Sequence, residues 1–109
     1  MDSVLILSNT NTTLGIISDL LNSQPFSRIV TAQNCAEARR DVISDQFDLI
    51  IVDSPLPDEF GDDFSLYAAE QTDAGIILIV NNDKVYDISP DIEDAGVFVL
   101  PKPVSPEFF

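Results

Sequence analysis

Five apolar runs recur along the chain, each bounded by polar or turn-forming residues. An apolar run without alternating polar positions is typical of a strand covered on both faces, as in the parallel sheets of α/β proteins. The runs comprise Val4–Leu7, Ile29–Val30 within residues 28–32, Leu49–Val52, Gly75–Val80 and Val97–Leu100. The pattern therefore predicts five buried strands.

Two amphipathic helices are predicted between the first three strands. Thr12 or Thr13 can cap the first helix, which stops before Pro25. Asn34 can cap the second, with Glu37 three residues later in the capping-box position. Helical spacing predicts that apolar residues face inward, namely Leu14, Ile17, Leu20 and Leu21 in the first helix and Ala36, Ala38, Val42 and Ile43 in the second.

The third and fourth helices follow the third and fourth strands. Asp62 or Asp63 can cap a helix that runs to about residue 72, with Phe64, Leu66, Tyr67 and Ala68 as its apolar stripe. Pro90 breaks the helical pattern of residues 85–92, so we expect a short or distorted helix there, with Ser89 and Pro90 at its start. Gly96 then ends it.

Alternating strands and helices with long crossovers predict parallel connections in an open, doubly wound α/β fold. We expect five strands in the order 2-1-3-4-5, with helices on both faces. Ser105 and Pro106 are typical of a helix start, and Phe108 and Phe109 follow at once. We therefore expect a truncated or missing fifth helix, and a chain that is one domain, residues 1–109, of a longer protein with a C-terminal output domain.

The composition limits the classes of function. Nineteen acidic and five basic residues give a net charge of −14, which opposes direct binding of nucleic acid and of anionic membranes. One cysteine, Cys35, and no histidine exclude an internal disulfide and the usual zinc and Cys/His catalytic sites. Cys35 is expected to be a buried core residue rather than a reactive thiol. With no apolar run long enough for a membrane helix, we expect a cytoplasmic protein.

Asp53 is the main candidate for chemistry, because it ends the third strand and opens a proline-rich loop. Ligands bind at the carboxyl edge of open α/β sheets, so a carboxylate there is a site candidate by position. The alternative is that Asp53 only caps the loop by accepting backbone N–H bonds.

The predicted order of elements and the Asp53 loop resemble the CheY-like receiver domains of response regulators over the whole chain. Leu56-Pro57 and Gly61 follow Asp53 at the spacing of the loop after the phospho-accepting aspartate, and Lys102-Pro103 follows the fifth strand as the family's lysine and proline do. The resemblance implies that Asp53 accepts a phosphoryl group and that Lys102 contacts a phosphoryl oxygen. It also implies a sensor histidine kinase or another signalling protein as partner, and no enzymatic activity beyond this acceptance.

Four positions depart from the receiver pattern. Receivers carry an acidic pair after the first strand that binds Mg²⁺, but Ser8 and Asn9 occupy these positions here. A magnesium site formed by Asp53, Asn9 and Ser8 is therefore predicted to be weak or absent. The phosphoryl-binding hydroxyl and the aromatic switch residue align with Val80 and Val99, and Phe98, which points to the other face, cannot replace the latter.

Two alternatives follow from these departures. Asp58 or Glu59 can offer a carboxylate to a relocated metal site, although a solvated acidic loop is the more ordinary interpretation.

The domain is then either a phosphorylated receiver or a degenerate receiver that serves as a phosphorylation-independent dimerisation or protein-interaction module. A small enzyme or nucleotide binder rests on fold analogy alone.

Residues 93–104 resemble the receiver-like domains of ANTAR-type antitermination regulators, in which an RNA-binding helical domain follows. This resemblance implies that any contact with RNA or DNA comes from an output domain. Phe108 and Phe109 favour self-association as a homodimer without selecting a surface.

Overall fold

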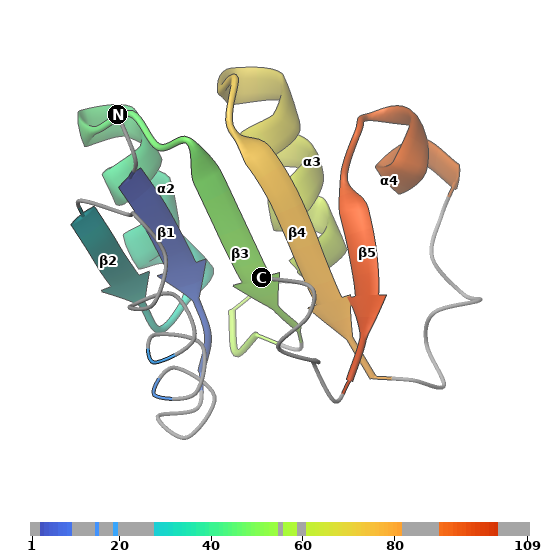
Figure 1. Cartoon of the computed structure of the whole chain (residues 1–109), viewed down its shortest axis with the longest axis horizontal. Coiled ribbons are helices and arrows are strands. Elements are labelled where there is room, and N and C mark those ends of the chain that lie inside the picture. Colours follow the sequence, from blue (N-terminus) through green and yellow to red (C-terminus); the bar gives the residue numbers. More distant parts are fainter. Residues whose placement is uncertain are drawn as a thin grey trace.

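The computed structural model describes residues 3–9, 15, 19, 28–54, 56–58, 61–81 and 90–102. Five strands and three helices lie within these ranges: β1 (Ser3–Leu7), β2 (Arg28–Ala32), α2 (Cys35–Ser44), β3 (Leu49–Asp53), α3 (Gly61–Gln71), β4 (Gly75–Val80), α4 (Pro90–Asp94) and β5 (Phe98–Pro101) (Figure 1). All five predicted strands are confirmed, and β5 starts one residue later than expected.

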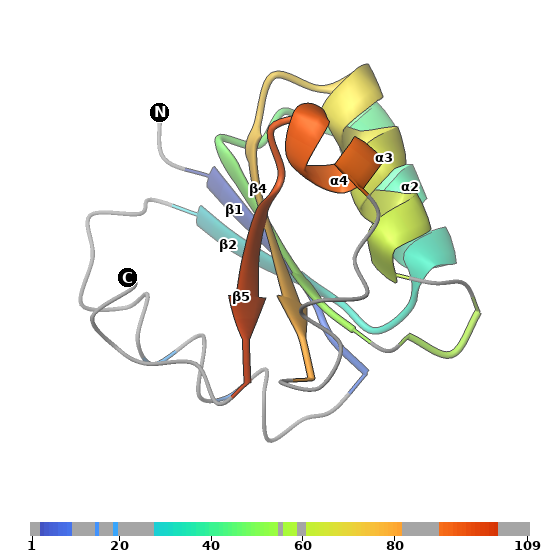
Figure 2. The same cartoon turned by 90° about the vertical axis from the view of Figure 1, so that its right-hand side faces the viewer.

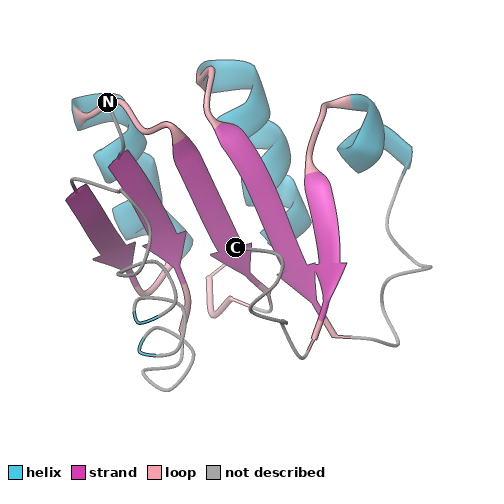
Figure 3. Cartoon of the chain, in the orientation of Figure 1, coloured by secondary structure: helices cyan, strands magenta, loops and turns pink. Residues whose placement is uncertain are grey.

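The strands form one open sheet (Figure 3), and their order is β2-β1-β3-β4-β5. Every neighbouring pair is parallel, so all five carboxyl ends meet at the same edge. The predicted strand order and α/β class are confirmed. The apolar runs explain the result, because β1 and most of β3 are buried and are apolar apart from Ser3 and Asp53 at their ends.

Helices α2, α3 and α4 lie on one face of the sheet (Figure 2). The larger core cluster, between these helices and the sheet, contains Leu5, Ile50, Phe64, Leu78 and Ile92. A second cluster of buried strand residues contains Val4, Ile6, Ile51, Ile79 and Leu100, which alternate with members of the first. The sheet is therefore buried on both faces at its centre.

Helix α2 begins as predicted, but it buries fewer side chains than predicted. The Asn34 side chain accepts a hydrogen bond from the Glu37 N–H at 2.9 Å, and the Glu37 carboxylate accepts one from the Gln33 N–H at 3.0 Å. The expectation that Ala36 and Ile43 face inward is wrong: both are exposed, and Ile43 retains 77% of its accessible surface. The buried stripe is narrower than predicted, because only Cys35 and Ala38 of this helix are fully covered.

Helix α3 begins at Gly61, so the prediction of a start capped by Asp62 or Asp63 is wrong. Gly61 packs closely on the residue that follows Asp53: a Cβ atom at Gly61 would lie 2.9 Å from Ser54 Cβ and 3.1 Å from Ser54 Oγ. Glycine is the residue that permits this approach. The first turn of α3 is therefore set directly against the end of β3.

The short helix α4 starts at Pro90, as the pattern predicted. It ends in a Schellman motif, in which the Gly96 N–H donates to the Glu93 carbonyl at 2.9 Å and the Val97 N–H donates to the Ile92 carbonyl at 3.2 Å. Gly96 has a φ of 88°, which explains the need for glycine there.

Two predicted elements lie outside the described residues. Of the helix predicted after Thr12, only Gly15 and Asp19 are described, and both are helical. The predicted start of a fifth helix at Ser105 also lies outside the described residues. None of the described helices has the length and apolar character that crossing a membrane requires.

Candidate functional site

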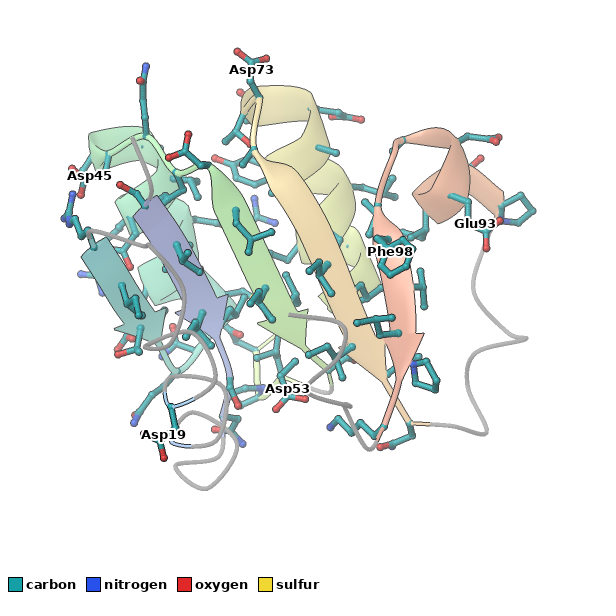
Figure 4. The ribbon with its side chains drawn as sticks, in the orientation of Figure 1. Asp19, Asp45, Asp53, Asp73, Glu93 and Phe98 are labelled. Carbon is teal, nitrogen blue, oxygen red and sulfur yellow. The ribbon has the colours of Figure 1, made fainter. Side chains whose placement is uncertain are left out.

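Three residues that the sequence singled out come together at the carboxyl edge of the sheet. Ser8 follows β1, Asp53 ends β3 and Lys102 follows β5. Figure 4 shows Asp53 at this edge, far from Asp45 and Asp73 at the opposite one. The backbone is fixed beside each of the three by one more bond of the sheet ladder: Ser8 N–H to the Ala32 carbonyl, Ser54 N–H to the Ile79 carbonyl and Lys102 N–H to the Val80 carbonyl, each 2.9 Å.

The Asp53 carboxylate is held from two sides. Ser8 Oγ donates a hydrogen bond to Oδ2 at 2.7 Å, and the Lys102 ammonium lies 2.8 Å from Oδ1. The Asp53 side chain is 4% exposed and that of Lys102 is 32% exposed, so the lysine is the solvent-facing side of the pair. Lys102 Nζ also donates to the Ser54 carbonyl at 2.8 Å, which fixes the ammonium beside the carboxylate.

The two carboxylate oxygens of Asp53 are in different states. Oδ2 accepts the Ser8 hydroxyl, whereas Oδ1 is buried and accepts no hydrogen bond of adequate geometry in the described part of the chain. The contact of Oδ1 with Lys102 is therefore an ion pair, because Coulomb attraction at 2.8 Å does not depend on the alignment that a hydrogen bond requires. Within the described residues, Oδ1 thus contacts the Lys102 ammonium and Oδ2 accepts the Ser8 hydroxyl.

The described residues at this edge do not fit a magnesium ion. Mg²⁺ takes six oxygen ligands in near-octahedral geometry and is usually held by one or two carboxylates. Asp53 is the only carboxylate described as contacting Ser8 and Lys102, the Ser8 proton already points to Oδ2, and Asn9 is exposed. No group of three acidic, histidine or cysteine side chains within the described ranges is arranged to hold a metal.

Asp58 has a structural role that sequence reasoning missed. Its two carboxylate oxygens accept the backbone N–H groups of Cys35 and Ala36, both at 2.9 Å, in the first turn of α2. These backbone hydrogen bonds, that of Cys35 first, lower the pKa of Asp58 from its ordinary value of 3.8. Asp58 is therefore engaged by the helix rather than free in the loop, while Glu59 lies outside the described residues. Cys35 itself is fully buried, as expected.

The two positions aligned with the receiver switch residues, Val80 and Val99, lie on one face of the sheet, and Phe98 lies on the other. Val80 is buried and Val99 is partly buried, and both pack in the larger core cluster below the helices. Phe98 is 57% exposed and projects from β5 on the other side (Figure 4). The geometry agrees with the expectation that Phe98 does not occupy the place of Val99. The role of Val80 and Val99 as degenerate switch positions stays a prediction.

No protein-family model and no curated protein matches the sequence. Solved structures do match. A signal receiver domain of an HD domain-containing protein from Pseudomonas fluorescens aligns over 98% of this chain and 86% of its own, with a TM-score of 0.86 and 20% identity. A two-component response regulator from Clostridium difficile aligns over 99% and 88%, with a TM-score of 0.83 and 22% identity.

A response regulator from Thermotoga maritima, solved in complex with Mg²⁺ and BeF, aligns over 94% of this chain and 90% of its own, with a TM-score of 0.77 and 22% identity. Likeness at such identities establishes the architecture, while chemistry has to be argued from the site itself. The parallel sheet in the order β2-β1-β3-β4-β5, with Asp53 at its carboxyl edge, gives this chain the fold of CheY-like response regulator receiver domains.

Proposed function

We propose that the chain is the receiver domain of a two-component response regulator and that Asp53 is its phosphoacceptor. The observation that carries the proposal is the buried Asp53 carboxylate at the carboxyl edge of the sheet, with the Lys102 ammonium 2.8 Å from Oδ1. A carboxylate nucleophile beside a fixed cation is the arrangement that aspartyl phosphate formation needs. The solved receivers of the same fold support the assignment by analogy.

Acceptance of the phosphoryl group follows from the state of the two oxygens. Oδ1, which accepts no hydrogen bond within the described residues, attacks phosphorus and forms the new O–P bond. The bond between phosphorus and the leaving group, a histidine nitrogen of a kinase or the acyl oxygen of a small donor, breaks and its electron pair goes to that group. Asp53 loses no proton because it reacts as the carboxylate.

Lys102 stabilises the transferred group. An ammonium has three N–H donors, so Lys102 can keep its bond to the Ser54 carbonyl while a second N–H donates to a phosphoryl oxygen. Because the lysine is the solvent-facing side of the pair, the donor approaches from that side. The added charge then biases the packing of β4, α4 and β5. The link to this face is the hydrogen bond from the Lys102 N–H to the Val80 carbonyl, which joins the ends of β5 and β4.

The wider role rests on the same proposal. The domain acts in the cytoplasm with a sensor histidine kinase or another signalling protein, is not an enzyme for a separate substrate, and passes its state to an output domain. The ANTAR-like residues 93–104 favour an RNA-binding output, so nucleic acid is contacted outside this segment.

Incubation with acetyl phosphate tests the proposal. The intact mass of the protein is expected to rise by one phosphoryl group, and the increase is expected to disappear in Asp53→Asn. Asp48→Asn is the matched control, because Asp48 precedes the same strand but lies at the opposite edge. An unchanged mass, or a gain that survives Asp53→Asn, would refute phosphoryl acceptance at this site.

A second candidate function is a receiver scaffold that binds partners without phosphorylation. The favouring observation is that two groups of the protein itself, the Ser8 hydroxyl and the Lys102 ammonium, engage both oxygens of Asp53. In this case Asp53→Asn in the full-length protein leaves signalling in cells intact. Loss of signalling in that variant would count against this candidate and for phosphorylation.

A further inference from the structure

We infer that Ser8 takes the place of a divalent cation at this site, so that Asp53 is oriented and charge-balanced by protein groups alone. The inference concerns the proposed site but does not depend on phosphoryl transfer to it. Ser8 is then a positioning residue for Asp53 and not a metal ligand.

The Ser8 hydroxyl occupies one of the two carboxylate oxygens of Asp53 that a cation could bind, Oδ2, while Lys102 lies beside the other. Ser8 Oγ and Asp53 Oδ2 are 2.7 Å apart, a normal length for a hydroxyl donating to a carboxylate, and both residues are buried. The Ser8 backbone is itself fixed by its N–H bond to the Ala32 carbonyl. A cation at Oδ2 would have to displace this proton from a position that the strand ends hold in place.

The charges lead to the same conclusion. Asp53 and Lys102 form a pair with no net charge, and the carboxylate of Asp58, in the loop after β3, is engaged by the first turn of α2. A divalent ion added here would leave a net charge of about +2 at a buried site, which is strongly unfavourable without further carboxylates. An aspartate in place of Ser8 would supply both the charge and the oxygen ligands.

The role of Ser8 is therefore to orient Asp53. By holding Oδ2, the hydroxyl turns Oδ1 toward Lys102 and leaves that oxygen as the nucleophile. The Ser8 hydroxyl and the Lys102 ammonium together orient Asp53 and balance its charge. Where an acidic pair is present, a metal ion and an ammonium would share these two tasks.

Manganese binding, with no phosphodonor present, tests the inference directly. The EPR signal of free Mn²⁺ reports how much ion is bound by the wild type, Asp53→Asn, Ser8→Asp and the double variant that carries both substitutions. Salt at about 0.15 M weakens diffuse attraction to the acidic surface, because the Debye length is then only about 8 Å. The two variants with Asn at position 53 correct for binding that does not involve Asp53.

The wild type and Asp53→Asn are expected to give the same weak, unsaturated binding curve. Ser8→Asp is expected to gain one saturable site, about tenfold tighter or more, which the added Asp53→Asn removes. A saturable site in the wild type that Asp53→Asn abolishes would overturn the inference even if Ser8→Asp failed to fold. A folded Ser8→Asp without a new site would overturn it too. Neither result bears on phosphorylation, which the acetyl phosphate experiment decides separately.

Discussion

The ion pair between Asp53 and Lys102 is expected to couple the two residues more strongly than a surface pair of similar geometry. The perturbation is a double-mutant cycle of Asp53→Asn and Lys102→Met, followed by urea unfolding. The chain itself supplies a matched control: Arg28 and Asp45 are 3.1 Å apart, but their side chains are 50% and 37% exposed, against 32% and 4% for Lys102 and Asp53.

The magnitude follows from these exposures. Breaking a fully buried pair costs about 3–5 kcal/mol, whereas exposed pairs contribute about 0.2–1 kcal/mol. Because Lys102 still reaches solvent, we expect a coupling free energy of about 1–3 kcal/mol for the site pair, between these limits. For the pair of Arg28 and Asp45 we expect less than about 1 kcal/mol, even though Asp45 raises the pKa of Arg28 through a hydrogen bond and Coulomb attraction.

Far-UV circular dichroism is the appropriate signal, because the chain has no tryptophan. The cycles are measured at low salt and at about 1 M salt, where the Debye length falls to about 3 Å. The control coupling is expected to fall toward zero at high salt, and the site coupling to persist. Equal couplings with the same salt response would refute the view that Asp53 and Lys102 form a partly desolvated unit.

Three further variants test individual contacts. Ser8→Ala leaves a buried carboxylate oxygen without its donor, so it is expected to lower the free energy of unfolding by about 1–3 kcal/mol in urea titrations; no loss would mean that the hydroxyl does not hold Oδ2. Gly61→Ala forces a methyl group against Ser54 and is expected to cost about 1–3 kcal/mol in the same assay; a neutral result would show that the approach is not close. The lowered pKa of Asp58 means that the stability it contributes is complete above its ordinary pKa of 3.8 and is lost as the pH falls through the lower pKa of the folded state. Asp58→Asn is therefore expected to flatten the acid side of the stability profile relative to the surface control Asp73→Asn, and identical profiles for the two variants would contradict the contact with α2.

The strands and their order could be predicted because the evidence for them is local. Each run such as Leu49–Val52 is apolar throughout, and the segments between runs are long enough for the crossovers that a parallel sheet requires. The positions of Asp53 and Lys102 at one edge follow from the same rule, since both stand at the carboxyl ends of parallel strands.

The partners of these residues could not be predicted in the same way. Asp58 bonds to α2 across 23 positions of the chain, and Ser8 bonds to Asp53 across 45, so no local pattern marks either contact. The exposure of Ile43 could not be predicted either. Helical spacing shows which way the apolar stripe of a helix faces, but not how much of that stripe the neighbouring elements cover. Local sequence thus specifies where the site lies, and tertiary packing specifies how its oxygens are satisfied.

The most direct test of the central claim is to locate the phosphoryl group on the chain. After incubation with acetyl phosphate, borohydride reduction converts an aspartyl phosphate into homoserine, which mass spectrometry of the peptides identifies by position. We predict homoserine at position 53, formed in the presence of EDTA as well as of Mg²⁺. Formation only with Mg²⁺ would contradict the role given to Ser8. The absence of homoserine at position 53 under every condition would contradict the assignment of Asp53 as the phosphoacceptor.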